Sequence, residues 1–459
     1  MLRIHELFLF TLRKICLLVL NLFDLSLKFN GFPIGKATLA LNDIQQINET
    51  NFETYLNNKK QDIVSYHLKH TPFYSKLAKN ASPFDWNSIP VMTKNDLQQP
   101  LNDRFSEGYN QKNVYVNKTS GSSGNPFVFA KDKFCHALTW AIIKNRFGWY
   151  GLDFNSSKQA RFYGIPLDKK GYFKERFKDA LSKRYRFSVF DLSDEAFHNY
   201  TRIFESKEFD YINGYTSSIV QFAKYLERQN LHLKNICPTL KACVVTSEML
   251  FENDKALMET QFGVPVINEY GASELDIIAF QNPKKEWQVT SETLCVEILD
   301  ENNNILPYGE EGRIVITSLY NKAHPFIRYD IGDIGILSKQ STLKKPILEK
   351  LIGRTNDMAI LPSGKKAAGL TFYYITKSII EDDGSVKEFI IEQHQKDTFV
   401  IKYVSSEELS TKKMKLISKE MEHYLENGLH IHLERVQQLE RSKSGKLKQF
   451  SSLIPKENS

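Results

Sequence analysis

Short apolar runs and helical stretches alternate in the middle of the chain, and this alternation limits the possible folds more than any other feature. Apolar runs at 211–213, 242–246 and 264–268 are separated by helical patterns at 217–229 and 252–262. Strands that alternate with helices in this way form βαβ units, in which the strands are parallel and the helices cover the sheet. The sequence therefore predicts an α/β fold with a mainly parallel sheet.

The length of the chain indicates more than one domain, because 459 residues exceed what one compact core normally holds. Short strands dominate from Glu297 onward and predict a small β subdomain near 292–337. The polar break at 353–357 precedes a compact α+β piece of roughly 100 residues, a size typical of an independent domain. We therefore expect three parts: an apolar N-terminal helix (1–30), a large N-terminal domain (31–353) and a small, mobile α+β C-terminal domain (354–459).

The N-terminal segment contains two apolar runs, at 7–12 and 15–23, which Arg13 and Lys14 separate. The second run is shorter than the roughly 18 residues that suggest a membrane-spanning helix, and no small-residue cleavage site follows it. A helix packed on the protein's own core is the leading interpretation. A helix lying on the inner membrane surface is the open alternative. The expected location is therefore cytoplasmic, with peripheral contact to the inner face of the membrane left open.

The net charge and the cysteine and histidine content indicate which kinds of ligand and metal the chain can bind. A net charge of +7 over 459 residues is mild; it suits small anionic substrates or a membrane surface and does not indicate a nucleic acid. The five cysteines are scattered and form no C-x-x-C pair, which favours reduced, buried thiols. The histidines form no metal-binding cluster either, so we expect no zinc.

The segment 119–126 reads T-S-G-S-S-G-N-P. Glycine lets the backbone approach a ligand closely, and the amide and hydroxyl groups around it can hold an anion, as in a phosphate cradle. No Lys-Ser or Lys-Thr follows the last glycine, so this is not a Walker loop. Apolar segments at 114–117 and 127–130 predict a strand on each side. Alone, the segment is equally typical of a surface loop.

Four further polar motifs follow in order. The segment Glu269–Glu274 follows an apolar run. It contains an acidic residue, which can bind Mg²⁺, and an aromatic residue, which can stack on a purine. Arg328–Asp333 ends in a carboxylate that can accept from both ribose hydroxyls. Gly353–Asp357 offers Arg354 to a ribose or phosphate. Arg441–Lys446 is basic. Each alone is also typical of an ordinary turn or a basic tail.

Taken together, these motifs resemble the adenylate-forming superfamily of acyl-CoA synthetases, adenylation domains and luciferases. The match is nearest to the phenylacetate–CoA ligase branch and its CapK-like proteins of capsule clusters. The family patterns are T-S-G-[ST]-[ST]-G-x-P, Y-G-x-[ST]-E, R-Y-x-x-G/R-D, G-R-x-x-D-M and a C-terminal G-K. They match this chain at 119–126, 270–274, 328–333, 353–358 and 445–446. Softer matches lie at 72–74, 89–94 and 246–248, and the likeness runs from about Thr50 to Phe450.

The resemblance implies ATP and Mg²⁺ as ligands and assigns roles to individual residues. Glu274 would coordinate Mg²⁺, Lys446 would stabilise charge near the α-phosphate, and Asp357 would be the hinge of the small domain. Residues near Trp140, Tyr215 and Val245 would line the acid pocket. The residues that would contact the nucleotide are Thr119, Ser120, Gly121, Ser122, Ser123, Gly124, Ser247, Glu248, Tyr270, Gly271, Ala272, Ser273, Asp333 and Arg354. Within this set, 119–124 would hold the pyrophosphate end, Tyr270 and 247–248 would flank adenine, and Asp333 and Arg354 would grip the ribose.

The implied function is a ligase that activates a small carboxylic acid as an acyl adenylate and releases pyrophosphate. It would pass the acyl group to a thiol of CoA or of a phosphopantetheine carrier protein, or to an amine, in surface polysaccharide biosynthesis. The region before the hinge, 343–347, lacks the cysteine/histidine cluster of some relatives, so no structural zinc is expected. The segment 362–366 departs from the CoA-ligase pattern, so the acceptor is left open. The alternatives are an aryl–CoA ligase of catabolism and a non-catalytic nucleotide-binding scaffold of a glycan assembly. A kinase-like reading fails because the chain has neither a Walker loop nor a kinase catalytic loop.

Overall fold

The computed structural model describes residues 21–119, 127–164, 179, 182–354, 358–368, 386–441 and 447–454. A seven-stranded sheet lies at the centre, in the order β4-β3-β5-β6-β7-β8-β9. Its strands are β3 (Gln159–Phe162), β4 (Arg184–Phe187), β5 (Tyr211–Tyr215), β6 (Ala242–Thr246), β7 (Val266–Ala272), β8 (Asp276–Gln281) and β9 (Trp287–Val289). The first five strands of this order are parallel, and the β7–β8 and β8–β9 pairings are antiparallel, which confirms the prediction of a mainly parallel sheet.

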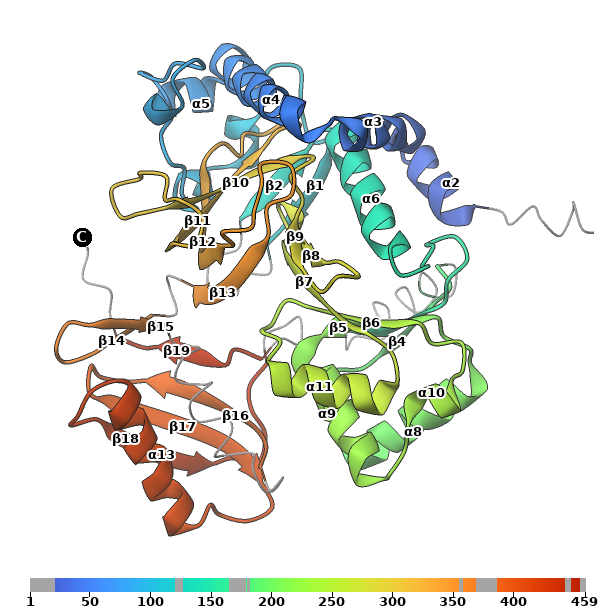
Figure 1. Ribbon diagram of the computed structural model, residues 1–459, viewed down its shortest axis with the longest axis vertical. Coiled ribbons are helices and arrows are strands. Elements are labelled where there is room, and N and C mark those ends of the chain that lie inside the picture. Colours follow the sequence, from blue (N-terminus) through green and yellow to red (C-terminus); the bar gives the residue numbers. More distant parts are fainter. Residues whose placement is uncertain are drawn as a thin grey trace, which may run out of the picture.

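Helices cover both faces of this sheet, and so its central strands are apolar on both sides. Every residue of β5 and β6 is buried. On one face lie α8 (Asp194–Ser206), α9 (Thr216–Arg228), α10 (Leu233–Ile236) and α11 (Glu252–Phe262) (Figure 1). Phe162, Phe187 and Phe222 form the centre of the core beneath them, each at most 1% exposed. The other face packs against α6 (Lys133–Gly148), whose Phe147 contacts Phe280 of β8.

A second, antiparallel sheet follows, in the order β10-β11-β12-β13. It consists of β10 (Leu294–Leu299), β11 (Glu311–Ser318), β12 (Tyr329–Leu337) and β13 (Leu348–Arg354). The predicted β subdomain is therefore present, and its last strand extends beyond Leu337. A separate hairpin of β1 (Tyr115–Lys118) and β2 (Val128–Lys131) confirms the strands predicted on either side of the Gly/Ser-rich segment.

In the described residues that precede these sheets, the helices are α2 (Leu22–Phe29), α3 (Ile34–Gln46), α4 (Glu49–His70) and α5 (Pro72–Leu77). Three 3₁₀ turns connect them to β1, at Trp86–Ser88, Asp96–Gln98 and Leu101–Arg104. Leu27 of α2 is buried among apolar residues of α3 and α6, so this part of the N-terminal segment packs on the protein's own core. Lys144 of α6 holds Asp24 of α2 at 2.6 Å. None of the helices in the described part of the chain is both long and apolar enough to cross a bilayer.

The C-terminal region forms a four-stranded sheet in the order β18-β17-β16-β19, against which α13 (Thr411–Tyr424) packs. The strands are β16 (Val386–Gln393), β17 (Thr398–Ser405), β18 (His430–Arg435) and β19 (Phe450–Ser452), preceded by the hairpin of β14 (Met358–Ile360) and β15 (Lys366–Ala368). This region has its own core, which includes Phe389, Ile401 and Met421. The expected small α+β C-terminal domain is thus confirmed, whereas its predicted hinge, Asp357, lies outside the described residues.

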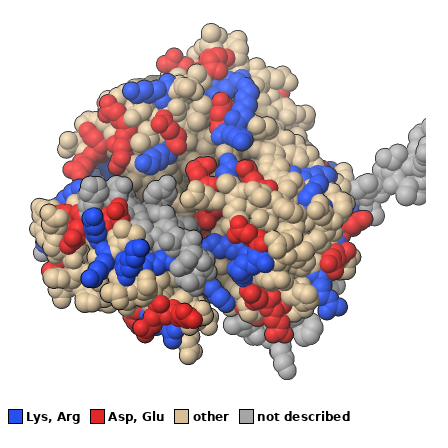
Figure 2. All heavy atoms as spheres, turned by 60° about the horizontal axis from the view of Figure 1, so that its bottom comes forward, with Lys and Arg blue, Asp and Glu red and all other residues tan. Residues whose placement is uncertain are grey.

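Two properties predicted from composition can be followed in the structure. The four described cysteines, Cys135, Cys237, Cys243 and Cys295, are free and buried. On the face shown in Figure 2, basic and acidic side chains are interspersed, so the net charge of +7 is not gathered into one block there.

Candidate active site

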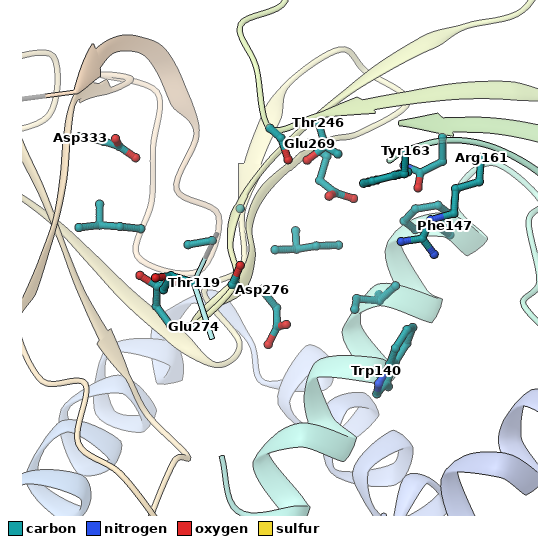
Figure 3. Close-up of a pocket in the computed structure, with 18 of the residues that line it drawn as sticks. Thr119, Trp140, Phe147, Arg161, Tyr163, Thr246, Glu269, Glu274, Asp276 and Asp333 are labelled. Carbon is teal, nitrogen blue, oxygen red and sulfur yellow. The ribbon is translucent and has the colours of Figure 1, made fainter. Parts of the chain in front are cut away.

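A cavity of about 790 Å³ opens between the central sheet and strand β12 of the second sheet. Thr246 and Ala272, at the carboxyl ends of β6 and β7, are on its wall, which is the usual position of a ligand site in an open α/β sheet. Figure 3 shows two groups of side chains across it, with Asp333, Thr119 and Glu274 on one side and Arg161 and Trp140 on the other. We call the first the motif end, defined by Thr119, Ser247, 271–274 and 329–333. We call the second the arginine end, defined by Gln159, Arg161, Tyr163, Arg184 and Glu269.

The tight connection between β7 and β8 brings Ser273 and Glu274 to the motif end. Gly271 makes it possible, because a Cβ at this position would lie 2.4 Å from the carbonyl oxygen of Asp276. One oxygen of Glu274 accepts a hydrogen bond from the Tyr329 hydroxyl at 3.1 Å. Burial and the neighbouring Glu274 carboxylate raise the pKa of Tyr329, so this hydroxyl remains a donor.

Asp333 lines the motif end from β12, and its Oδ2 accepts a hydrogen bond from Tyr270 at 2.6 Å. The prediction that Tyr270 flanks adenine requires correction. Its ring is 7% exposed, packs against Trp287 and is not part of the cavity wall, so Tyr270 positions Asp333 from behind. Arg354 lies opposite Asp333 in the register of β12 and β13, as expected for two residues predicted to share one ligand group.

The predicted Ser247–Glu248 pair divides between two roles. Ser247 lines the cavity in a left-handed conformation, with φ of 72°. Glu248 does not flank the cavity as predicted. Its carboxylate accepts from the backbone amide of Ser217 at 2.7 Å and from that of Leu447 at 3.0 Å. Glu248 therefore ties the large domain to the C-terminal segment directly after Lys446.

A second contact joins the same two parts of the protein. Phe251, three residues after Glu248, is buried within the apolar core of the C-terminal domain. Arg441 bonds Glu388 at 2.5 Å within that domain and reaches the Ser217 hydroxyl at 3.4 Å. The segment from Ser247 to Phe251 thus touches both the cavity and the C-terminal domain.

The arginine end combines charged groups with aromatic walls. Arg161 lies 4.4 Å from the centre of the Tyr163 ring, and the aromatic side chains of Trp140, Phe147 and Phe154 also line the cavity. Burial raises the pKa of Glu269 to about 7, although a hydrogen bond from Thr246 and the charge of Arg161 act in the opposite direction.

Only one of the three residues proposed for an acid pocket lies on the cavity wall. Trp140 lines the cavity, whereas Tyr215 is buried behind Tyr163, with their ring centroids 4.6 Å apart. Val245 is fully buried because it alternates with Thr246 along β6 and faces the opposite side of the sheet.

The sequence analysis missed several residues of the cavity. Arg161 belongs to no motif, and Glu269 stands at the start of the polar segment 269–274, one residue before the family pattern. The two residues lie on separate strands. Thr93 and Lys94 reach the cavity because their segment is attached to β12, where Asp330 donates its amide to the carbonyl of Met92 at 2.8 Å. The soft match at 89–94 was the only signal for them. The predicted residues Ser120–Gly124, Asp357 and Lys446 lie outside the described residues.

The donor set at the motif end is compatible with Mg²⁺ only as part of a nucleotide complex. In the described residues, no group of three or more histidine, cysteine or acidic side chains could hold a metal ion by itself. Glu274 supplies one carboxylate, and Mg²⁺ is commonly held by one or two carboxylates together with substrate phosphates and water. Glu274 therefore fits the role of a single protein ligand.

Comparison with known proteins agrees with this architecture. Residues 362–452 match the family model of the CapK C-terminal domain. The chain aligns with phenylacetate–coenzyme A ligases of Aromatoleum evansii (24% identity over 238 residues, 48% of this chain and 52% of the relative) and Pseudomonas putida (23% over 289 residues, 60% and 63%). The structure superposes on 2-hydroxyisobutyryl-CoA ligase in a postadenylation state with a TM-score of 0.65 and 16% identity, covering 87% of this chain and 89% of that chain.

The chain has the fold of the adenylate-forming ligases. The resemblance drawn from its motifs, to the phenylacetate–CoA ligase branch and to CapK-like proteins, is therefore confirmed. The alignments with the two curated relatives span only 52% and 63% of their length.

Proposed function

We propose that this protein is an ATP-dependent adenylate-forming ligase that activates a small carboxylic acid. The observation that carries the proposal is the motif end itself. Four motifs far apart in the sequence supply Thr119, Ser247, Glu274 and Asp333 to the wall of one cavity. A surface loop, a capping aspartate and a solvated turn, the ordinary explanations of these motifs taken singly, would not place them together.

In the first step, a carboxylate oxygen of the acid attacks the α-phosphorus of ATP. The bond to the oxygen that bridges the α- and β-phosphates breaks, and pyrophosphate leaves without any proton transfer to the acid. The protein's task is to orient two anions and screen their charge. Thr119 with Ser120–Gly124 would hold the pyrophosphate end, Asp333 and Arg354 the ribose, and Ser247 with 271–273 the region of the base. A magnesium ion on Glu274 would neutralise phosphate charge.

Lys446 is the proposed source of positive charge at the α-phosphate. The contact between Glu248 and the amide of Leu447 supports this role, because it holds the neighbouring residue beside the segment that forms the cavity wall. In the second step, a thiol or amine attacks the acyl carbonyl, AMP leaves, and the acceptor loses its proton. Rotation about Asp357 would withdraw Lys446 and admit the acceptor. Both assignments carry over from the family motifs.

The proposals for the acyl acceptor and for the pathway depend on the adenylation reaction proposed above. The CapK family match supports a role in surface polysaccharide assembly, with CoA, a carrier-protein thiol or an amine as acceptor. The relatives' names support the alternative of an aryl–CoA ligase, but charged residues at the arginine end weigh against an aryl acid. We also propose a cytoplasmic location, with the N-terminal segment as the point of any membrane contact.

Carboxylate-dependent ATP–pyrophosphate exchange tests the proposal. Pools of amino acids, aryl acids, aliphatic monoacids and diacids are supplied separately to the purified full chain. Exchange that depends on one pool is the expected result. ATP binding without exchange in any pool would contradict the proposal and favour the non-catalytic nucleotide-binding scaffold.

A further inference from the structure

Arg161 presents unused hydrogen-bond donors to the cavity. Its Nε is buried without a hydrogen-bond partner, and within the described part of the chain its guanidinium forms no hydrogen bond or ion pair. Its one strong contact is the face of Tyr163. A guanidinium carries five N–H donors, and a charge removed from water without acceptors is unfavourable by several kcal/mol.

The neighbouring arginines differ from Arg161 in this respect. Arg184 and Arg186 both pair with Asp179: Arg184 contacts Oδ1, and Arg186 contacts both carboxylate oxygens. Asp179 is therefore already engaged from both sides. The amides at the same end are also engaged, because Gln159 donates to Asn213 at 3.1 Å and Asn213 donates to the carbonyl of Val244 at 3.2 Å. Among the arginines of this end, Arg161 thus differs from Arg184 in having no ion pair with an acidic residue in the described part of the chain.

The acidic residues nearby do not neutralise Arg161. Asp276 pairs with Lys131 and accepts from the Thr139 hydroxyl at 3.0 Å. Glu269, on the side of the arginine end nearest the motif end (Figure 3), forms no ion pair with Arg161 among the described residues. Burial raises the pKa of Glu269 to about 7, so its carboxyl is only partly ionised near neutral pH and offsets the charge of Arg161 only in part. The arginine end then has an unbalanced positive charge.

We infer that the acid activated by this protein carries a second anionic group, a distal carboxylate, and that Arg161 binds it. This inference rests on the proposed function and names the substrate class, a short dicarboxylic acid. A carboxylate matches the planar fork of a guanidinium with two parallel hydrogen bonds. The rings of Trp140 and Phe147 flank the space for the connecting carbon chain. The reacting carboxylate then lies toward the motif end.

Competing acids fit this end less well. An aryl or aliphatic monoacid fills the apolar walls but leaves Arg161 without an acceptor. An acid with a distal ammonium group faces repulsion from Arg161, which a partly ionised Glu269 offsets only in part. The relative activities with dicarboxylic acids, monoacids and acids with a distal ammonium group therefore show which distal charge the site prefers.

The test compares matched acids in the exchange assay with the full chain. Succinate, glutarate and adipate are each compared with their monoamides, and with phenylacetate and 4-aminobutyrate. The best dicarboxylate should exceed its own monoamide about 100-fold in kcat/KM. Equal rates for diacid and monoamide, or a preference for phenylacetate or 4-aminobutyrate, would overturn the inference and leave the proposed function standing.

Arg161→Gln removes the charge and should raise the KM for the dicarboxylate about 100-fold, with the KM for ATP unchanged and the monoamide now preferred. Arg161→Lys should recover part of the loss. Arg435→Gln, at an exposed strand of the C-terminal domain, is the control. A uniform loss for all acids in Arg161→Gln would indicate a structural role and overturn the inference.

Calorimetric titration of the same acids, without ATP, decides the inference if no acid supports exchange. Dicarboxylate binding that disappears in Arg161→Gln would support the inference while the proposed function fails. No exchange with any acid, together with no dicarboxylate binding to the unmodified chain, would overturn both.

Discussion

The two ends of the cavity differ in how their polar groups are satisfied. At the motif end, Glu274 has Tyr329 and Asp333 has Tyr270 as fixed hydrogen-bond donors. At the arginine end, Arg161 lacks such a partner among the described residues. Carboxylates that are already held by hydrogen-bond donors are suited to binding one invariant ligand. A guanidinium without an acceptor is suited to a ligand that supplies the missing acceptor. The difference is what we expect between the proposed nucleotide site, built from family motifs, and the proposed substrate site, which no family motif supplies.

Lys446→Ala should lower the adenylation rate more than any of the other substitutions considered. It should leave the difference between the motif end and the arginine end unchanged. Loss of a cation near the α-phosphate is expected to lower adenylation roughly 10²–10³-fold for every acid alike, because it acts on the nucleotide. Transfer from a supplied acyl adenylate should persist. Exchange and single-step transfer assays measure the two steps separately.

Lys448→Ala is the matched control for that experiment. Lys448 lies two residues further along the same segment, and its replacement should preserve both steps. If Lys448→Ala abolished adenylation and Lys446→Ala did not, the motif alignment at the C-terminus would be shifted. If both steps fell equally in Lys446→Ala, its proposed role would be wrong.

Asp333→Ala is expected to raise the KM for ATP about 100-fold, since a carboxylate that accepts from two hydroxyls contributes two charge-assisted bonds. The KM for the acid should change little. Tyr270→Phe removes only the donor behind Asp333 and should raise the KM for ATP less than tenfold. Steady-state exchange at varied ATP measures both. A larger effect of Tyr270→Phe than of Asp333→Ala would mean that Tyr270 itself contacts the base.

These two residues also show how far the sequence could predict the site. The motif Tyr270–Glu274 correctly located a turn on the cavity wall, because glycine and acidic residues at fixed spacing encode local backbone geometry. It could not show that Tyr270 points into the core, because the direction of a side chain depends on neighbours such as Trp287 that are distant in sequence. The fold class was predictable for the same reason as the turn, because hydrophobic periodicity and turn motifs both depend on residues that are close together in the sequence.

The arginine end was not predictable, and the reason is physical. Arg161 and Asp179 are both charged residues with apolar neighbours in the sequence, and nothing in that context shows whether either has an ion-pair partner. Only packing decides that Asp179 is shared by two arginines while Arg161 has no acceptor among the described residues. Glu248 was likewise assigned to the nucleotide by its place in a motif, whereas its contact with Leu447 arises from the arrangement of two domains.

Glu248→Ala tests that contact and should lower adenylation about tenfold, because the amide of Leu447 loses its charged acceptor. Transfer from supplied acyl adenylate should be unchanged. Glu248→Gln retains one acceptor oxygen and should restore part of the rate. Thermal unfolding monitors the loss of the second bond, to Ser217. A higher KM for ATP with an unchanged rate at saturation would instead support the original assignment beside adenine.

Glu269→Gln probes the arginine end through stability rather than rate, and its effect is the smallest. Burial raises the pKa of Glu269 from 4.5 to about 7, so between these values the folded protein keeps a proton that the unfolded chain loses. Its contribution to stability is therefore fully present below about pH 4.5 and is lost as the pH rises through about 7.

Glutamine cannot ionise, so Glu269→Gln should resemble the unmodified protein at pH 5 and exceed its stability at pH 8.5, by at most about 2–3 kcal/mol. The difference in Tm between the two proteins, measured across this range, gives the result, and the exposed Glu301→Gln serves as control. A constant difference would mean that Glu269 is ionised throughout and balances Arg161. The arginine end would then carry no open charge, and the contrast between the two ends would disappear.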